Sequence, residues 1–272
     1  SSNNYRLIVG EHVKTSTNTM NSWYSQINNN NVMSGFRLYD SPNCIILGGD
    51  YAIVAGTQIY NIDSYISVGS QYPNSNGPNI FMLYGSNIQR NSDTTINTNI
   101  IINSGNVLEL MGGAQNGSTA SSTIEVAGGY VSYLTGGPRS GSYTVGNGSG
   151  TTAVKINVSG GTVDYLFSGA KDGNTRSDMA QAPVKGNVEI KVSGGKIYGL
   201  FGGGYDFWSK TVGNGVIGNI DILITGGQIG KSLDDSSTNY WNAIGDSIPN
   251  KPSNYYSIEP GVYGGGYRGS VE

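Results

Sequence analysis

The stretch that decides the fold is Ile190–Gly203, IKVSGGKIYGLFGG, and the chain carries close copies of it. The shared pattern is I-x-V-x-G-G-x-V-x-x-L-x-G-G. It recurs as IEVAGGYVSYLTGG at Ile124–Gly137, as INVSGGTVDYLFSG at Ile156–Gly169 and, less regularly, as IIINSGNVLELMGG at Ile100–Gly113. Internal repeats define a whole architecture, so this pattern is interpreted before any single residue.

The spacing of the copies indicates a solenoid. The second residue of each central Gly-Gly or Ser-Gly pair serves as an anchor, which gives Gly105, Gly129, Gly161, Gly195 and Gly227. The anchors follow one another at intervals of about 24 to 34 residues, a period that is typical of solenoids, propellers and arrays. In these architectures each repeat packs on its neighbours, and they usually work through a long regular surface.

The residues around each anchor alternate as in a β-strand. Ile stands at position −5 and Ile or Val at −3, whereas Glu125, Asn157 and Lys191 are polar residues at −4. A period of two predicts that −5 and −3 face the core and −4 mostly faces solvent. Val or Ile at +2 and Leu at +5 are also expected in the core. Positions +2 and +5 are three residues apart, so a regular strand would point them to opposite faces. A bend or bulge is therefore expected between them.

The glycines are expected to form the corners, because glycine tolerates positive φ and close backbone approach. The sequence therefore predicts an all-β fold, a parallel β-solenoid (a β-helix or β-arch stack) with rungs of about 32 to 34 residues. The longer loops between rungs are expected to carry β-turns or small hairpins. The predicted corner glycines are Gly48, Gly49, Gly105, Gly128, Gly129, Gly160, Gly161, Gly194, Gly195, Gly226 and Gly227.

The motif also extends toward the start of the chain. Cys44–Gly56, CIILGGDYAIVAG, fits it with Cys44 at position −5, so Cys44 is expected to be a small buried hydrophobe and not a reactive thiol. Ile66–Gly85 is a degraded copy, in which Ile80 and Met82 are expected on one face.

Toward the other end, Gly261 follows Gly227 after one further interval of the repeat. The segment from Tyr256 through Val262 and Tyr263 is therefore expected to form a final rung, without a cap beyond it. An uncapped ladder edge templates further strands. Val262, Tyr263 and Tyr267 are the candidate assembly edge.

The beginning of the chain, residues 1–40, fits the repeat poorly. Within it Arg6–Val9 and Phe36–Tyr39 are candidate strands, and Thr19–Ile27 is a candidate short helix. Terminal units of solenoids are often atypical because they cap exposed edges. We therefore divide the chain into an N-terminal cap region, residues 1–40, and solenoid repeats, residues 41–272.

The composition of the chain limits the classes of function and the partners that are expected. The net charge is −3 and no Lys/Arg run occurs, which argues against a nucleic-acid partner. No apolar stretch approaches the roughly 18 to 20 residues of a membrane span. The chain has 36% hydrophobic residues and 19 Tyr, so it is expected to be ordered in spite of its 43 Gly. Low charge with abundant Asn, Ser, Thr and Tyr favours an extracellular or cell-surface location.

No catalytic or metal site is predicted. His12 is the only histidine, so Ser-His-Asp, Cys-His and zinc arrangements lack their residues. Asp234 and Asp235 are expected to lie in a solvated turn. Asp164 is the acid that falls among the middle strands, and Lys155, Lys191 and Lys196 form no constellation with it. We therefore expect no enzyme, no cofactor and no metal.

A row of tyrosines is a candidate binding site. Tyr133 and Tyr165 share position +4 of successive rungs, and Tyr198 stands one place earlier in the next rung. A tyrosine ladder stacks either on sugar rings or on its own neighbours across strands and subunits. The structural alternative is favoured, and the sugar platform stays open.

The repeats between Ile100 and Gly227 resemble those of glycine-rich β-solenoid surface proteins of bacteria and archaea. The phrases VSGGT and VSGGK followed by an aromatic residue are similar to repeat adhesins. Low charge and an uncapped end resemble the amyloid-like sheath proteins of methanogenic archaea. The resemblance implies an architecture and carries over no functional residues.

Three functions follow from these observations. The first is a structural extracellular protein that self-assembles, head-to-tail or laterally, into a sheath, fibre or surface layer. The alternative is a carbohydrate-binding or adhesive module, whose partner would be a surface polysaccharide. The third is a polysaccharide lyase or hydrolase, for which the acid–base residues are missing.

Overall fold

The fold is all-β. The computed structural model describes residues 7–10, 37–38, 43–56, 62–70, 77–86, 96–139, 143–148, 150–170, 184–204, 215–230 and 261–266. Within these ranges every regular element is a strand and none is a helix. No helix in the described part of the chain therefore has the length and apolar character to cross a membrane. The candidate helix at Thr19–Ile27 lies outside the described residues, as do His12, Asp234, Asp235 and Tyr267.

Two large parallel sheets, here named sheet A and sheet B, contain nearly all described strands. In order, sheet A consists of β1 (Leu7–Val9), β3 (Asn43–Ile46), β5 (Ser64–Val68), β7 (Asn97–Ile102), β9 (Ser121–Val126), β11 (Thr152–Val158), β14 (Asn187–Val192) and β17 (Ile220–Ile224). Sheet B runs through β2 (Arg37–Leu38), β4 (Asp50–Ala55), β6 (Asn79–Tyr84), β8 (Asn106–Met111), β10 (Tyr130–Thr135), β12 (Thr162–Phe167), β15 (Lys196–Phe201) and β18 (Gln228–Ile229), with β19 (Gly261–Tyr263) also beside β15.

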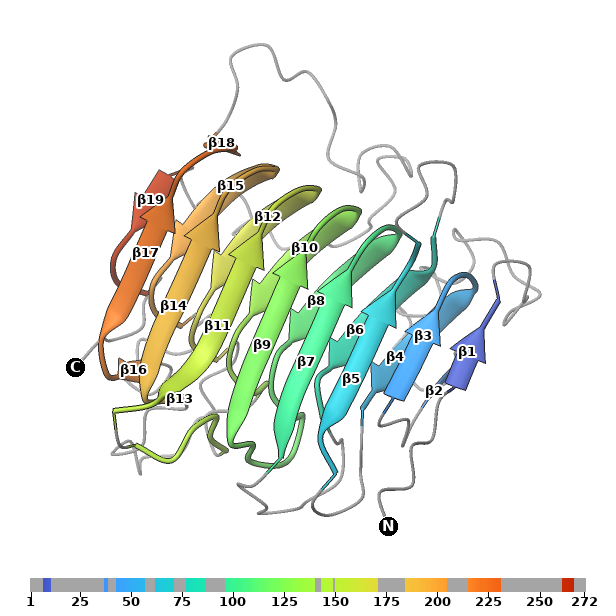
Figure 1. The fold of residues 1–272 in the computed structure, drawn as a ribbon, viewed down its shortest axis with the longest axis horizontal. Coiled ribbons are helices and arrows are strands. Elements are labelled where there is room, and N and C mark those ends of the chain that lie inside the picture. Colours follow the sequence, from blue (N-terminus) through green and yellow to red (C-terminus); the bar gives the residue numbers. More distant parts are fainter. Residues whose placement is uncertain are drawn as a thin grey trace, which may run out of the picture.

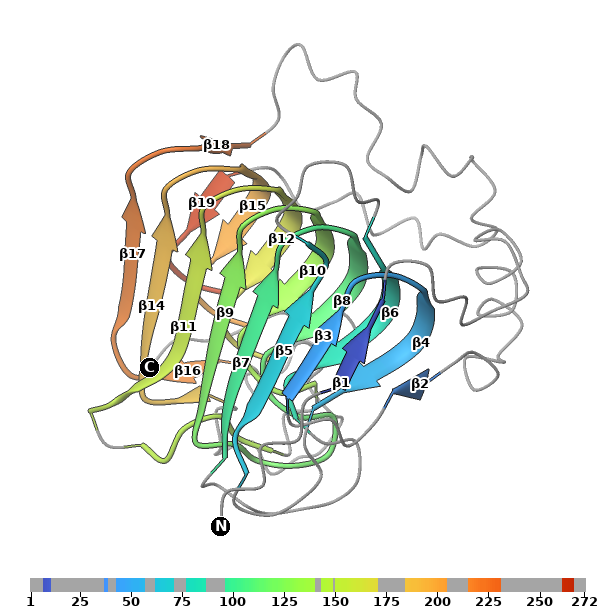
Figure 2. The same ribbon diagram turned by 45° about the vertical axis from the view of Figure 1, so that its right-hand side comes forward.

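The chain alternates between the two sheets, so that each sheet A strand is followed by a sheet B strand in a separate layer (Figures 1 and 2). One such pair with its connecting turn is called a rung below. Equivalent residues of successive rungs pair directly, for example Ile124 with Ile156 and Ile156 with Ile190. Parallel strands stacked in two sheets, as predicted from the repeat, are the arrangement of a parallel β-solenoid.

The core lies between the two sheets. Residues at −5 and −3 alternate with outward residues along sheet A, as in β9, where Ile124 and Val126 are fully buried and Glu125 is not. Val131 and Leu134 of the next strand face them from sheet B, and all four belong to one hydrophobic cluster. Burial of an Ile, Val or Leu side chain contributes roughly 1.5 to 3 kcal/mol, and this cluster repeats the contribution in every rung.

Sheet B contains the bend that the sequence predicted between +2 and +5. Val163 and Leu166 are both in the core cluster, although a regular strand would point them to opposite faces. The ladder between β12 and β15 pairs Val163 with Ile197 and Tyr165 with Gly199, and it omits Asp164. The same position is omitted in the other long pairs of sheet B, so the irregularity is itself repeated.

This bend explains one wrong expectation. Ile80 and Met82 do not share a face: Ile80 belongs to the core cluster between the sheets, and Met82 belongs to a second cluster that includes Ala52 and Tyr84. The chain changes face after position +2, so the parity rule that holds along sheet A fails in sheet B.

Loop segments form a short third ladder, which is parallel and differs from the β-turns or small hairpins predicted for the longer loops. Val145 bridges Thr119 and Val184 in parallel, and β13 (Val184–Lys185) pairs with β16 (Val216–Ile217). Val145, Val184 and Val216 are buried in the same core cluster as the large sheets. Parts of these loops therefore close one side of the core.

The final segment does not form a rung of its own, contrary to the sequence expectation. Val262 pairs with Leu200 and Tyr263 with Phe201, while β18 pairs with the first half of the same strand, β15. β18 and β19 thus share one level of sheet B. The repeat interval from Gly227 to Gly261 does not mark a new level, because Gly261 pairs with Gly199.

The described parts of region 1–40 extend both sheets. The candidate strands in Arg6–Val9 and Phe36–Tyr39 are confirmed as β1 and β2, which pair in parallel with β3 and β4. Leu7 and Val9 stand in register with Cys44 and Ile46. The division into a cap region, 1–40, and repeats, 41–272, stays a prediction.

Candidate functional site: the terminal edges and the aromatic rows

In several rungs a glycine pair lies between the sheet A strand and the sheet B strand. Gly160 and Gly161 lie between β11 and β12, and Gly161 has φ of 68°. A Cβ on Gly161 would lie 2.7 Å from the carbonyl oxygen of Gly129 in the previous rung, and one on Gly160 would overlap the carbonyl of Ala127. The glycines at the same place in other turns also have positive φ; they are Gly49, Gly105, Gly129, Gly195 and Gly227. The first glycines Gly128, Gly194 and Gly226 likewise leave no space for a Cβ.

The tyrosine ladder lies on the face of sheet B that points away from the core. Tyr133 and Tyr165 pair in register, with ring centroids 5.3 Å apart and stacked. Gly199 follows them in the ladder, and Tyr198 instead places its ring edge-on to Tyr165, with centroids 5.5 Å apart. Tyr133 and Tyr165 are buried and Tyr198 is half-buried. Little of these ring faces is open to a sugar.

A second aromatic row lies at position +6, near the second glycine pair of the repeat. The rings of Phe167 and Phe201 stack at 4.8 Å, and those of Phe201 and Tyr263 stack at 4.6 Å with planes 2° apart. Phe167 and Phe201 are almost fully buried. The signal was present in the pattern x-L-F before the glycines, but the place of Tyr263 in this row depends on the pairing of β19 with β15.

The edge formed by β17, β18 and β19 leaves core-position side chains open to solvent. Ile224 is 42% exposed, whereas its ladder partner Val192 is fully buried at 0%. Val262 is 46% exposed, and its partner Leu200 is at 0%. Both candidate edge residues that the structure describes, Val262 and Tyr263, therefore lie at an exposed sheet edge.

The opposite edge, formed by β1 and β2, is exposed as well. Leu7 and Ile8 are both exposed large hydrophobic residues, and Leu7 stands in the same core column as the fully buried Ile66 and Ile100. The two ends of sheet A are far apart in Figure 1, with the other strands of the sheet between them. Each end thus presents an apolar strand edge.

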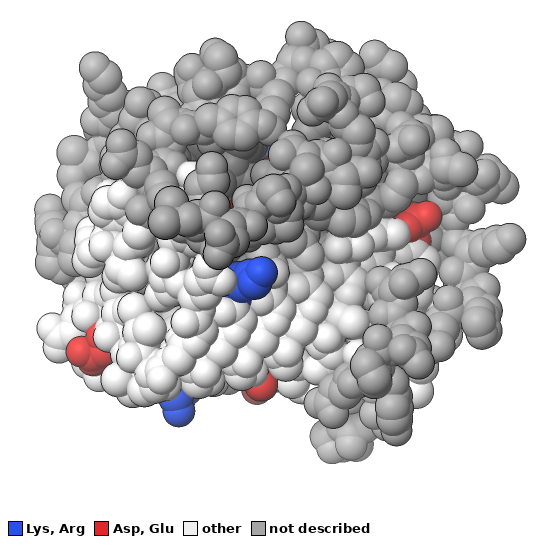
Figure 3. All heavy atoms as spheres, turned by 90° about the horizontal axis from the view of Figure 1, so that it is seen from above, with Lys and Arg blue, Asp and Glu red and all other residues white. Residues whose placement is uncertain are grey.

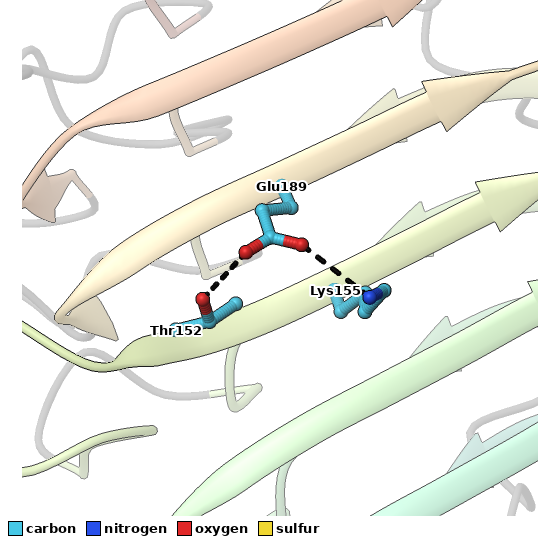
Figure 4. Close-up of polar contacts among 3 residues, drawn as sticks. All are labelled: Thr152, Lys155 and Glu189. Atoms are coloured by element: carbon cyan, nitrogen blue, oxygen red, sulfur yellow. Dashed lines mark hydrogen bonds and ion pairs between the residues drawn. The ribbon is translucent and has the colours of Figure 1, made fainter.

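Among the described residues on the face seen from above in Figure 3, charged side chains are few and separated. The described ion pair is on the outer side of sheet A, where Lys155 Nζ lies 3.4 Å from Glu189 Oε2 (Figure 4). Thr152 donates a 2.7 Å hydrogen bond to Glu189 Oε1, and this bond, followed by Lys155, lowers the pKa of the Glu189 carboxyl. All three side chains are open to solvent, so the pair adds little stability.

Asp164 on sheet B is engaged with neighbouring hydroxyls. Asp164 accepts hydrogen bonds from the hydroxyl of Tyr130 and, at 3.1 Å, from Ser132 Oγ. Glu109 is buried on the same sheet. The described residues include no group of three or more His, Cys, Asp or Glu that could hold a metal ion.

Cys44 is a buried core residue, as predicted. Its side chain is 1% exposed, packs in the main cluster and pairs in register with Ile66. Burial raises the pKa of the thiol to about 12. The thiol is therefore protonated at neutral pH and is a poor nucleophile.

No protein-family model matches the chain, and neither a curated protein nor a solved structure matches it.

Proposed function

We propose that this chain is a structural, non-enzymatic extracellular protein that self-assembles through the edges of its sheets into a cell-surface sheath, fibre or layer. The observation that carries the proposal is that side chains at core positions are exposed at both ends of the sheets. The clearest cases are Ile224 and Val262, which lie at the end formed by β17, β18 and β19. The edge strand of a sheet presents a row of backbone N–H and C=O groups with which a further strand can pair.

The energetics favour edge pairing. Burying the open part of an Ile or Val side chain would contribute about 1 kcal/mol for each residue, because these side chains are a little under half exposed. Backbone hydrogen bonds along the new ladder would add to this. Self-repulsion is weak, since the net charge is −3 and charged residues are 12% of the chain.

The repeat supplies a natural building unit. In the proposal each rung of about 32 to 34 residues, with glycine corners, is one layer of the assembly. Addition of a second molecule then continues the same layer spacing of about 4.8 Å. The first expected partner is another copy of the chain, and a surface polysaccharide is a further one.

Two observations count against the other functions. The burial of Tyr133 and Tyr165 leaves little of either ring on which a sugar could stack. The carboxylate of Asp164 is held by Tyr130 and Ser132, and in the described part of the chain this arrangement supplies no acid–base pair for polysaccharide cleavage.

Electron microscopy of the purified protein tests the proposal. Negative-stain images across a concentration series should show regular fibres, sheets or tubes that resist SDS. Discrete rods that stay monodisperse at the highest concentration would exclude self-assembly as the function. A parallel light-scattering series distinguishes ordered growth, which has a critical concentration, from amorphous precipitation.

A further inference from the structure

We propose that copies of the chain join head to tail in one fixed register, with β17 of one copy pairing in parallel with β1 of the next. Ile222 then pairs with Leu7, Leu223 with Ile8 and Ile224 with Val9. This inference rests on the proposed self-assembly and adds to it the polarity and the residue pairs of the contact.

The polarity follows from strand direction. Every pairing between named strands is parallel. Two like ends can meet only if one molecule is related to the other by a two-fold axis perpendicular to the stack. This axis runs either along the strands or across the two sheets, and in both cases the strands in contact become antiparallel. Only the joining of unlike ends keeps the parallel ladder, and repetition of that contact gives an open filament.

The register follows from the columns of sheet A. Position −5 is occupied in successive strands by Leu7, Cys44, Ile66, Ile100, Ile124, Ile156, Ile190 and Ile222, each paired with the next. Position −3 runs in the same way from Val9 to Ile224. Both columns are apolar at every level, so continuing them places Ile222 on Leu7 and Ile224 on Val9. A slip by one residue would turn the core side chains outward.

A repeated hydrogen bond fixes the same register. In each rung the backbone N–H that follows the −3 residue donates to the carbonyl of the −3 residue in the previous rung, as from Leu47 to Val9 at 2.8 Å and from Thr225 to Val192 at 2.8 Å. The rungs in between repeat this bond. It runs from Gly69 to Ile46, Asn103 to Val68, Ala127 to Ile102, Ser159 to Val126 and Ser193 to Val158. Across the contact, the N–H of Gly10 would donate to the carbonyl of Ile224.

The outward-facing residues at position −4 of sheet A also favour the pairing of β17 with β1. Position −4 is polar in three successive strands, at Glu125, Asn157 and Lys191, and then becomes apolar at Leu223. Leu223 is 57% exposed, and at the other end Ile8 is 55% exposed. Head-to-tail joining makes these two the direct cross-strand pair, and such apolar pairs stabilise a sheet.

Sheet B continues in the same step. Val262 is the last residue of its core column, and Leu38 is the first, since Leu38 pairs with Val54. Leu38 is partly buried against the core cluster, and Val262 is exposed. One translation along the stack therefore brings Val262 onto Leu38 while β17 reaches β1.

Disulfide trapping in the full chain tests the register. Ile8→Cys is combined with Leu223→Cys, because neighbouring strands are about 4.8 Å apart and a disulfide accepts Cα separations of about 4.4 to 6.8 Å. The matched control combines Ile8→Cys with Asp221→Cys. Asp221 is exposed on the same side of β17 but two residues away, which makes the Cα separation about 8 Å. Cys44 is buried and does not interfere.

After mild oxidation, the Ile8/Leu223 double variant should run on non-reducing SDS gels as a ladder of dimers, trimers and longer chains. The control pair should lose this ladder. A mixture of the two single variants should stop at a dimer. Circular dichroism verifies that each variant is folded, and both positions are solvent-exposed in the monomer.

Three results would overturn the inference. Dimers from either single variant alone would show that like ends join. A ladder from the Ile8/Asp221 pair would show a different register. Ordered assemblies in the microscope without any trapped ladder would mean that the molecules join laterally, and the proposed function would then survive while the head-to-tail contact would not. If the unmodified protein forms no assemblies, the proposed function itself fails.

Discussion

Replacement of Gly161 by Ala isolates the role of the stacked glycine turns. Gly161 has φ of 68°, and an added Cβ would meet the backbone of the previous rung, with Gly128 O and Gly129 O both at 2.7 Å. These neighbours are main-chain atoms that hold the ladder, as in the 2.9 Å hydrogen bond from Thr162 to Gly129, so they cannot move aside cheaply. The left-handed conformation alone costs an Ala about 1 to 2 kcal/mol.

The chain offers a matched control at Gly150. It has φ of 64°, but a Cβ there would meet nothing within 4 Å. Gly150→Ala therefore carries only the conformational cost, partly offset by the lower entropy of the unfolded chain, and should destabilise by about 1 kcal/mol or less. Gly161→Ala adds an overpacking cost of about 1 to 3 kcal/mol, so we expect a total near 3 kcal/mol.

Differential scanning calorimetry measures the difference. For a chain of this size 1 kcal/mol shifts the melting temperature by about 2 to 4 °C, so Gly161→Ala should melt about 4 to 8 °C below Gly150→Ala. Measurements at a concentration without assembly keep the comparison to the monomer. Equal melting temperatures for the two variants would refute the argument, because the backbone overlap would then have no energetic consequence.

Further outcomes are expected at other residues. Phe201→Ala removes the ring between Phe167 and Tyr263 and should lower stability by about 3 to 5 kcal/mol in urea unfolding, and a loss below about 1 kcal/mol would contradict a packed aromatic row. Because burial raises the pKa of the Cys44 thiol to about 12, the thiolate is scarce below that pH, so mass spectrometry should detect no alkylation of native protein at pH 8 and full alkylation in denaturant. Leu223→Lys should raise the critical concentration for assembly at least about 10-fold in light scattering without a change in melting temperature, and unchanged assembly would count against β17 as a contact.

Much of the fold follows from local pattern, and residues of sheet A show why. The alternation around Ile124, Val126, Ile156 and Val158 places these side chains in the core without knowledge of any partner, since successive side chains of a strand point to opposite faces. The burial of Cys44 was predictable for the same reason, because it occupies an isoleucine position of the repeat.

The candidate site was less predictable, because its exposure depends on neighbours. The positions of Tyr133 and Tyr165 in successive rungs were visible in the sequence, but their burial was not. The separation of Ile80 from Met82 required the repeated bend of sheet B, whose place the spacing of apolar residues alone did not give.

The sequence by itself determined the parallel β-strand repeat and the inward columns of sheet A, because the direction of each side chain depends on the conformation of a few adjacent residues. Only the tertiary structure decided that Val262 and Tyr263 share a level with β18, that Val145 joins a third ladder, and which strand edges are open. The physical reason is that pairing between strands a full repeat apart in the chain depends on which edge the folded sheets leave available, and a local pattern does not contain that information.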